Sequence, residues 1–141
     1  DVLLSQKYHL AHSKGVHFLF QLDDLTCFGL KDEHLVVVLS NLIDNAIDAC
    51  EKIADDKNKL ITLVMKTEEG SSYLYVENTT AFPVKILDNQ VVLPSKQSEE
   101  HGYGLKNVAA ILNLYNAVFA ITYKEAPGLF CFSAQIPETL S

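Results

Sequence analysis

The sequence predicts a single α/β domain of about three helices and five strands. Two patterns carry this prediction. One long segment repeats its apolar residues with the period of a helix, and several shorter segments alternate apolar and polar residues as strands do. The chain has 141 residues, of which 48% are hydrophobic and 21% are charged, which matches one globular domain with an ordinary core.

The first half of the chain reads as a helix, a strand and a second helix. Residues 1–14 have helical spacing and end at Gly15, a residue type that commonly terminates helices. Residues 16–22 form the first predicted strand. The second helix spans residues 35–50 and is the most regular segment, because its apolar residues recur at i, i+3 or i+4 and i+7. These residues are Leu35, Leu39, Leu42, Ile43, Ala46, Ile47 and Cys50.

The second half contains four more strands, a long irregular segment and a third helix. Residues 60–66 and 72–77 alternate and are joined by E-E-G-S-S, which predicts a hairpin. Residues 79–101 show no period, and a connection far longer than the typical ~4–6 residues favours a lid or a binding loop. A helix over residues 103–115 follows H-G-Y-G directly, and residues 118–123 and 129–136 form the closing strands.

The composition argues against several classes of protein. No apolar run is long enough to span a membrane and no basic-then-apolar leader is present, so we expect a soluble domain. Cys27, Cys50 and Cys131 lack a C-x-x-C pairing, which argues against a disulfide framework or a zinc site and fits a reducing cytosol. The formal charge is −7 without a Lys/Arg cluster, so nucleic acid is not an expected partner. Because the chain is acidic, an anionic ligand would have to be bound through a metal ion or through backbone N–H groups.

Four short polar side chains lie among the apolar residues of the long predicted helix. Asn41, Asp44, Asn45 and Asp48 are spaced i, i+3, i+4 and i+7, so they form one stripe away from the apolar residues. A solvated face would explain the stripe, but such faces are usually built from Lys, Glu and Gln, which cost less helix propensity. Short oxygen-bearing side chains on a rigid helix suit Mg²⁺, which takes oxygen ligands and leaves other positions to waters and phosphates.

The stretch H-G-Y-G-L at residues 101–105 supplies the second feature. Gly102 and Gly104 lie between the irregular segment and the third helix, so backbone N–H groups at the helix start could face an anion. Alone, the two glycines favour a flexible hinge. Together with the oxygen-rich helix and a lid, they indicate binding of a Mg²⁺–nucleotide phosphate.

The two motifs together resemble a known family. N-L-I-D-N-A-I-D-A is similar to the N box, and H-G-Y-G-L-K-N-V to the distal glycine box, of the GHKL ATPase superfamily. Ser95 and Lys96, with S-K-G-V-H-F after the first helix, are most similar to sensor histidine kinases of the peptide-pheromone quorum-sensing type in Gram-positive bacteria. The resemblance implies a Bergerat-type α+β two-layer sandwich. In it, about three helices lie on one face of a mixed five-stranded sheet, and ATP lies between the N-box helix and a long lid.

The resemblance also implies roles for the N-box residues. Asn45 matches the asparagine that coordinates Mg²⁺ through its side-chain oxygen. Asn41 stands where hydrolysing relatives place a water-activating glutamate, and an amide cannot act as a general base, so simple hydrolysis is disfavoured. Asp48 stands where many histidine kinases carry a basic phosphate contact, so Lys96 or Lys52 would have to supply that contact.

The glycine box and the central strand complete the implied ATP site. Gly102 and Gly104, with the amides of Tyr103 and Leu105, would cradle phosphate oxygens. His101 begins this ATP-binding segment.

The central strand departs from the family pattern. Most of the superfamily ends it with D-x-G-x-G, whose Asp accepts a hydrogen bond from the adenine amino group. Here it ends V-E-N-T-T-A-F, which places Asn78 at the Asp position, and we expect weaker nucleotide binding.

The expected protein is the catalytic ATP-binding domain of a sensor histidine kinase. Residues 1–14 would end a helix from an upstream dimerisation domain, and residues 15–141 would form the catalytic domain. ATP and Mg²⁺ are the expected ligands, and the γ-phosphate would go to a histidine on the dimerisation domain of its own receptor.

The wider assembly follows from the same resemblance. The receptor is expected to be a membrane-anchored homodimer that signals to a response regulator, with this domain in the cytoplasm and without direct membrane contact. Two alternatives stay open. One is a non-catalytic module of the same fold that binds a partner, and the other is a stand-alone serine kinase or anti-sigma factor.

Overall fold

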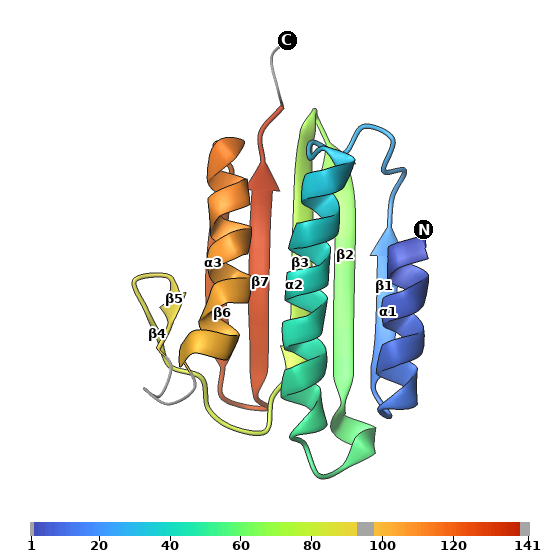
Figure 1. Cartoon of the computed structure of the whole chain (residues 1–141), viewed down its shortest axis with the longest axis vertical. Coiled ribbons are helices and arrows are strands. Elements are labelled where there is room, and N and C mark those ends of the chain that lie inside the picture. The colour runs from blue at the N-terminus through green and yellow to red at the C-terminus, as the bar shows by residue number, and fades with distance from the viewer. Residues whose placement is uncertain (1, 93–97, 139–141) are drawn as a thin grey trace.

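The computed structural model describes residues 2–92 and 98–138, and in it three helices cover one face of a five-stranded sheet (Figure 1). The helical layer consists of α1 (Val2–Ser13), α2 (Asp32–Glu51) and α3 (Ser98–Leu114). The sheet consists of β1 (His17–Leu22), β2 (Leu60–Glu68), β3 (Ser71–Thr79), β6 (Val118–Lys124) and β7 (Leu129–Ile136), in the order β1-β2-β3-β7-β6. Because β1 and β2 pair in parallel and the other neighbours pair antiparallel, the sheet is mixed as predicted.

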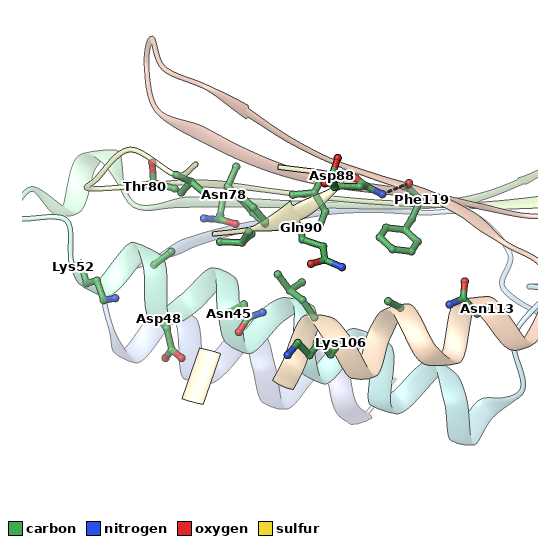
Figure 2. A pocket seen from close by; sticks show the side chains of 18 residues that line it. Asn45, Asp48, Lys52, Asn78, Thr80, Asp88, Gln90, Lys106, Asn113 and Phe119 are labelled. Atoms are coloured by element: carbon green, nitrogen blue, oxygen red, sulfur yellow. Dashed lines mark hydrogen bonds between the residues drawn. The ribbon is translucent and has the colours of Figure 1, made fainter. Parts of the chain in front are cut away.

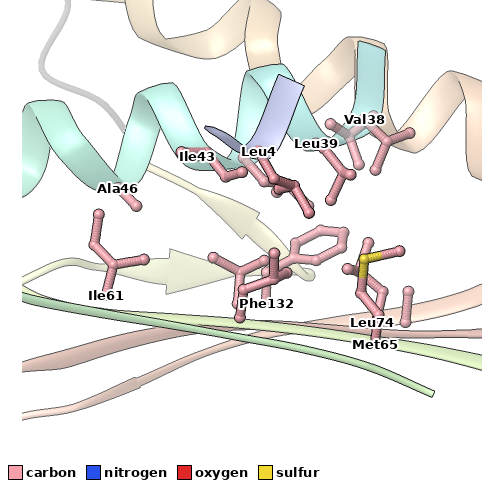
Figure 3. Packing of buried hydrophobic residues seen from close by; sticks show 14 of the residues in the cluster. Leu4, Val38, Leu39, Ile43, Ala46, Ile61, Met65, Leu74 and Phe132 are labelled. Carbon is pink, nitrogen blue, oxygen red and sulfur yellow. The ribbon is translucent and has the colours of Figure 1, made fainter. Parts of the chain in front are cut away.

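Helix α2 crosses the middle of the sheet and carries the N-box residues. Asp32 and Glu33 lie in its first turn, where negative charge is favourable because the N-terminal end of a helix is partially positive. Its apolar face packs on strand residues that include Met65, Leu74 and Phe132 (Figure 3). The buried residues of α2 are Val38, Leu39, Leu42, Ile43, Ala46, Ile47 and Cys50.

Strand β3 alternates its side chains strictly between the two faces of the sheet. Ser72, Leu74, Val76 and Asn78 are buried under the helices, whereas the residues between them point to the open face. Asn78 is paired with Ile61 on β2 and with Phe130 on β7, so it lies in the interior of the sheet. The alternation therefore brings one polar side chain to the helix-covered face at the end of the strand.

Helix α1 lies beside α2 and is joined to it by charge as well as by packing. Leu4 and Ala11 are buried. Lys7 Nζ lies 2.7 Å from Asp44 Oδ1. The helix ends at Ser13, and Gly15, the predicted stop signal, follows it with a φ of 75°.

The segment between β3 and α3, predicted to be irregular, contains a small hairpin of β4 (Ile86–Leu87) and β5 (Gln90–Val91). Asp88 and Asn89 form its turn with φ values of 52° and 59°, which matches the two-residue hairpin turn that needs positive φ at both positions. The Asn89 side chain joins the hairpin to β6: Nδ2 donates to the Phe119 carbonyl at 2.8 Å, and Oδ1 accepts from the Ile121 N–H at 2.7 Å.

Helix α3 begins at Ser98, ahead of the predicted start at residue 103. The expected start directly after H-G-Y-G is therefore wrong. A physical reason is that a glycine inside a helix costs only about 1 kcal/mol relative to alanine, so Gly102 and Gly104 do not interrupt α3. A short 3₁₀ helix, η1 (Asp56–Asn58), precedes β2. Among the described helices, none combines the length and apolar content that crossing a membrane would require.

Candidate functional site

A cavity of about 670 Å³ opens between the sheet and the helical layer, where α2 and α3 meet the β4–β5 hairpin (Figure 2). This volume is in the range of small-molecule sites, which hold about 300–1,000 Å³. Phe119, Ile121 and Phe130 form an apolar wall on the sheet side. The helical side contributes both polar and apolar residues, so the cavity suits a ligand with an apolar part and a charged part.

Helix α2 contributes the polar side through residues spaced about one turn apart. Asn45, Asp48 and Lys52 line the cavity. Asp44, by contrast, forms its ion pair with Lys7 of α1. The predicted single stripe is therefore divided: Asp44 is directed at the neighbouring helix, and only part of the stripe reaches the cavity.

Gly104 marks the contact between α3 and α2. A β-carbon at this position would lie 3.4 Å from Asn41 Oδ1, 3.5 Å from Asn45 Nδ2 and 3.6 Å from Asn45 Oδ1. Two amide oxygens thus gather at one point of the helical side. Asn41 is placed at this contact rather than on the cavity wall.

These amides are the residues best suited to hold a hard cation. No described group of three or more His, Cys, Asp or Glu side chains could hold a metal ion. A metal ion here would therefore take amide oxygens and complete its shell with waters and ligand phosphates, all of which are oxygen ligands of the kind that Mg²⁺ binds. The donor set of Asn41 and Asn45 fits such an ion.

Asn78 closes the sheet side of the cavity and is only 3% exposed. Its Nδ2 donates to the Thr79 carbonyl at 3.1 Å, which leaves Oδ1 as the atom able to accept a hydrogen bond from a ligand. Glu77 lies on the opposite face, where Cys131 Sγ approaches its Oε1 at 3.8 Å. Burial and the hydrogen bond with Cys131 raise the pKa of the neighbouring Tyr75 hydroxyl.

Thr80 brings a second polar group to the same end of the cavity. Its N–H donates to the Gly128 carbonyl at 3.0 Å, but its buried Oγ1 has no partner among the described residues. A buried hydroxyl without a hydrogen bond costs roughly 1–3 kcal/mol. The wall beside Asn78 thus has unused hydrogen-bonding capacity, which is consistent with a ligand site.

Cys50 fixes the end of α2 against the strands that carry these residues. Its Sγ donates to the carbonyls of Leu60 and Thr79, each at 3.7 Å. Burial raises the pKa of this thiol, so it stays neutral at physiological pH. The contact holds the C-terminal part of α2 close to Asn78.

The structure brings together some of the residues predicted from the sequence and separates others. Asn45, Asp48, Asn78 and Leu105 all line the cavity. Lys96 and Ser95 lie outside the described residues, as do the side chains of His101 and Tyr103.

The glycine box differs from the expected arrangement. Residues 102–105 lie beyond the first turn of α3, where helical amides donate to carbonyls four residues earlier. The amides of Tyr103 and Leu105 are therefore not the free N–H groups that were predicted for a phosphate cradle. The free amides of α3 belong to its first turn, which starts at Ser98.

Several cavity residues were missed by sequence reasoning. They are Thr80, Val84, Asp88, Asn89, Gln90, Val91, Lys106, Ala109, Asn113, Phe119, Ile121 and Phe130. The helical spacing of Lys106, Ala109 and Asn113 places them on one side of α3 and could have identified them. The hairpin residues gave no such signal, because their segment has no period.

The comparisons with known proteins agree with this architecture. The sequence profile described as the GHKL domain matches residues 30–137. No curated protein sequence matches the chain significantly.

Solved structures of three histidine kinases share the fold. The nucleotide-free catalytic domain of histidine kinase ThkA is 20% identical, with a TM-score of 0.71, over 97% of this chain and 91% of that chain. The histidine kinase domain of a blue-light activated kinase from Erythrobacter litoralis EL346 is 15% identical, with a TM-score of 0.64, over 94% and 56% of the two chains. Full-length ShkA, in complex with AMPPNP, is 20% identical, with a TM-score of 0.64, over 100% of this chain and 31% of that one.

These likenesses establish the fold as that of histidine kinase catalytic domains. The profile covers well over half of the chain and includes α2, the cavity and α3. This chain therefore belongs to the GHKL domain family.

Proposed function

We propose that this chain is the catalytic domain of a sensor histidine kinase, which binds Mg·ATP in the cavity and transfers the γ-phosphate to a histidine on a separate dimerisation domain. One observation carries the proposal. Asn45, Asp48 and Asn78, which lie far apart in the sequence, line a single cavity in a GHKL domain whose fold is that of histidine kinase catalytic domains.

The cavity offers a place for each part of the nucleotide. Adenine would lie at the end formed by Asn78, Ala49 and Phe130, with its amino group donating to Asn78 Oδ1. The phosphates would lie toward the helical side, near Asn45. Asn45 and Asn41 would hold Mg²⁺, which when bound neutralises part of the phosphate charge.

Phosphotransfer needs no general base from this chain. An imidazole nitrogen of the acceptor histidine attacks the γ-phosphorus with its lone pair, the bond from phosphorus to the bridging oxygen breaks, and ADP leaves with that electron pair. Asn41 cannot activate water, so the domain favours a histidine acceptor over hydrolysis. Its own residues bind and orient the nucleotide and exclude water from it.

The proposal also includes the subtype of histidine kinase to which the chain belongs. The lid sequence with Ser95 and Lys96, and the glycine box, favour the peptide-pheromone quorum-sensing type of bacterial kinase. Such a receptor would be a membrane-anchored homodimer whose phosphoryl group passes to a response regulator, with this domain in the cytoplasm.

A second candidate is a non-catalytic GHKL module that binds a protein partner. Two observations favour it. Asn78 offers a neutral oxygen where the family has a carboxylate, and the glycine box lies within α3 instead of exposing its amides. A stand-alone serine kinase or anti-sigma factor has no such observation in its favour.

Calorimetry and phosphotransfer together test the proposal. ATP titrated into the domain should bind in the presence of Mg²⁺ and bind more weakly after chelation by EDTA. With γ-labelled ATP, the domain alone should stay unlabelled, whereas the dimerisation domain of its own receptor should become labelled when the two are mixed. Labelling must also be sought in the full cytoplasmic region of the receptor. Binding without any labelling there would favour the non-catalytic module.

A further inference from the structure

Strand β1 forms one edge of the sheet, beside β2 (Figure 1). The N–H of His17 donates to the Lys59 carbonyl at 2.9 Å, and the pairing with β2 then continues without a bulge to Leu22. Because the main-chain groups of successive strand residues point to opposite sides, those of Phe20 and Leu22 point away from β2. Within the described part of the chain, no hydrogen bond uses these outward groups.

The sequence of β1, H-F-L-F-Q-L, gives this edge no protection against pairing. Proteins commonly guard a strand edge with lysine, proline or a bulge, and the six residues of β1 include none of these. Phe20 and Leu22 are 41% and 39% exposed, so solvent reaches the edge. At the opposite edge, by contrast, Asn89 hydrogen-bonds to the main chain of β6. β1 is therefore the edge at which another extended backbone can pair.

An apolar hollow of about 390 Å³ lies beside these outward groups. It is lined by Leu4, Ser5 and Tyr8 of α1 and by Phe20 and Leu22 of β1, and none of these described residues is charged. The rings of Tyr8 and Phe20 meet edge to face, with centroids 5.8 Å apart. A strand paired with β1 would place every second side chain on the face that carries the hollow. An apolar side chain at that position would fill it.

The C-terminal end of β1 is acidic. Asp23 and Asp24 follow the strand directly, and both are exposed. Neither of them takes part in the ion pairs of the described residues. The chain as a whole has a formal charge of −7, which also attracts a basic partner. A strand antiparallel to β1 begins at this end, so basic residues at its start would face the two carboxylates.

We propose that the edge of β1 binds an extended segment of a partner protein, which joins the sheet as a strand antiparallel to β1. The free main-chain groups require an extended backbone. The hollow selects apolar side chains at alternate positions, and Asp23 and Asp24 favour basic residues at the start of the segment. The residues that line the nucleotide cavity include none from α1 or β1, so the proposal does not depend on nucleotide binding.

A fluorescent peptide of sequence K-K-L-T-V-T-V-T tests the proposal by anisotropy. Its leucine would lie opposite Leu22 and its first valine opposite Phe20, so the N–H groups of these two peptide residues face β1 and those of the threonines face away. One methylated form carries N-methyl groups on the leucine and the first valine. A matched form carries them on the first two threonines. A further peptide replaces both lysines with glutamate.

The parent peptide should bind the wild-type domain, and methylation of the threonines should leave its affinity unchanged. Methylation of the leucine and the valine should weaken binding roughly tenfold or more, because two main-chain hydrogen bonds are lost. The glutamate peptide should bind more weakly than the parent peptide, and this difference should shrink at high salt because the charges are then screened.

Leu22→Pro tests the same edge from the side of the protein. Proline is tolerated in an edge strand where its missing N–H would face outward, so this variant should keep its melting temperature and its ATP affinity but lose the peptide. Leu19→Thr is the matched control, because Leu19 is an exposed residue of the same strand whose main chain bonds to β2. It should bind the peptide as the wild type does.

Three results would overturn the proposal. A parent peptide that does not bind at millimolar concentration would refute pairing at this edge. Equal binding of the two methylated peptides would show apolar adhesion without strand pairing. A wild-type domain that dimerises in sedimentation, competes with the peptide and becomes monomeric in Leu22→Pro would assign the edge to a second copy of the chain. If Leu22→Pro does not fold, the methylated peptides still decide, because they are measured on the wild-type domain.

Discussion

Gly104 of α3 lies directly against Asn45 of α2: a β-carbon at position 104 would lie 3.5 Å from Nδ2 and 3.6 Å from Oδ1 of that amide. These are ordinary van der Waals separations, so the backbone has room for alanine. The methyl group would nevertheless cover the amide that we assign to Mg²⁺. The glycine thus keeps this amide accessible between two closely packed helices.

Replacing Gly104 with alanine should therefore raise the stability of the domain and lower its affinity for ATP. Alanine in a helix interior is more favourable than glycine by roughly 0.5–1 kcal/mol, so the free energy of unfolding should rise. Mg²⁺-dependent ATP affinity should fall at the same time. Chemical denaturation and calorimetry on the same protein measure both quantities. A variant that is more stable and binds ATP as the wild type does would show that the methyl group leaves the site open.

Replacing Asn45 with alanine tests the metal assignment directly. The change removes one oxygen ligand and leaves the buried apolar face of α2 intact, so Mg²⁺-dependent ATP binding should fall with little change in melting temperature. Asp44→Ala is the matched control, because Asp44 is the adjacent residue and pairs with Lys7 outside the cavity. Equal ATP affinity in Asn45→Ala and Asp44→Ala would contradict the assignment.

Asn78 and Glu77 allow a prediction about which side chain binds the adenine base. A hydrogen bond to a charged acceptor is worth about 1.5–3 kcal/mol and a neutral one about 1 kcal/mol, so Asn78→Asp should tighten ATP several-fold and increase selectivity over GTP. Glu77→Gln should change neither, because Glu77 points to the open face of the sheet. If Glu77→Gln abolished ATP binding and Asn78→Asp left ATP affinity unchanged, the residue that accepts the adenine hydrogen bond would be Glu77 and not Asn78.

The buried Cys50 thiol predicts a pH dependence of stability. Burial raises its pKa in the folded state, so the folded protein holds this proton more tightly than the unfolded chain does. The resulting stability is complete below the unfolded pKa of about 8.5 and is lost as pH rises toward the folded value. The free energy of unfolding should fall as pH rises above about 8.5, and it should fall less in Cys50→Ser, whose hydroxyl does not titrate there. An equal fall in both proteins would exclude Cys50 as the cause.

Residues with a strong local period could be placed from the sequence. The apolar spacing of α2 predicted most of its buried face, because a helix that packs on a sheet must present one continuous apolar side. The prediction missed the buried Val38, and it included Leu35, which is only half-buried. The alternation of β3 predicted that Asn78 and Glu77 point to opposite faces, since successive strand residues do so. The mixed five-stranded sheet under three helices, which the family resemblance implied, is confirmed.

The remaining features depend on contacts between distant segments. Asp44 faces α1 because it forms an ion pair with Lys7, and the sequence around Asp44 gives no indication of this distant partner. Asn89 lies on the cavity wall because its side chain bonds to the Phe119 carbonyl and the Ile121 N–H, about thirty residues later in the chain. The start of α3 was misplaced because glycines in H-G-Y-G suggest an interruption, whereas the helix continues through them.

The same two hydrogen bonds of Asn89 have a consequence for the behaviour of the protein at high concentration. β6 is the last strand of the sheet, so one side of its backbone has no neighbouring strand. Exposed strand edges of this kind recruit other chains and lead to aggregation. Asn89 occupies the N–H of Ile121 and the carbonyl of Phe119 on that edge. The hairpin that encloses the cavity thereby also shields the sheet from intermolecular strand addition, and any opening that breaks these bonds would expose the edge to self-association.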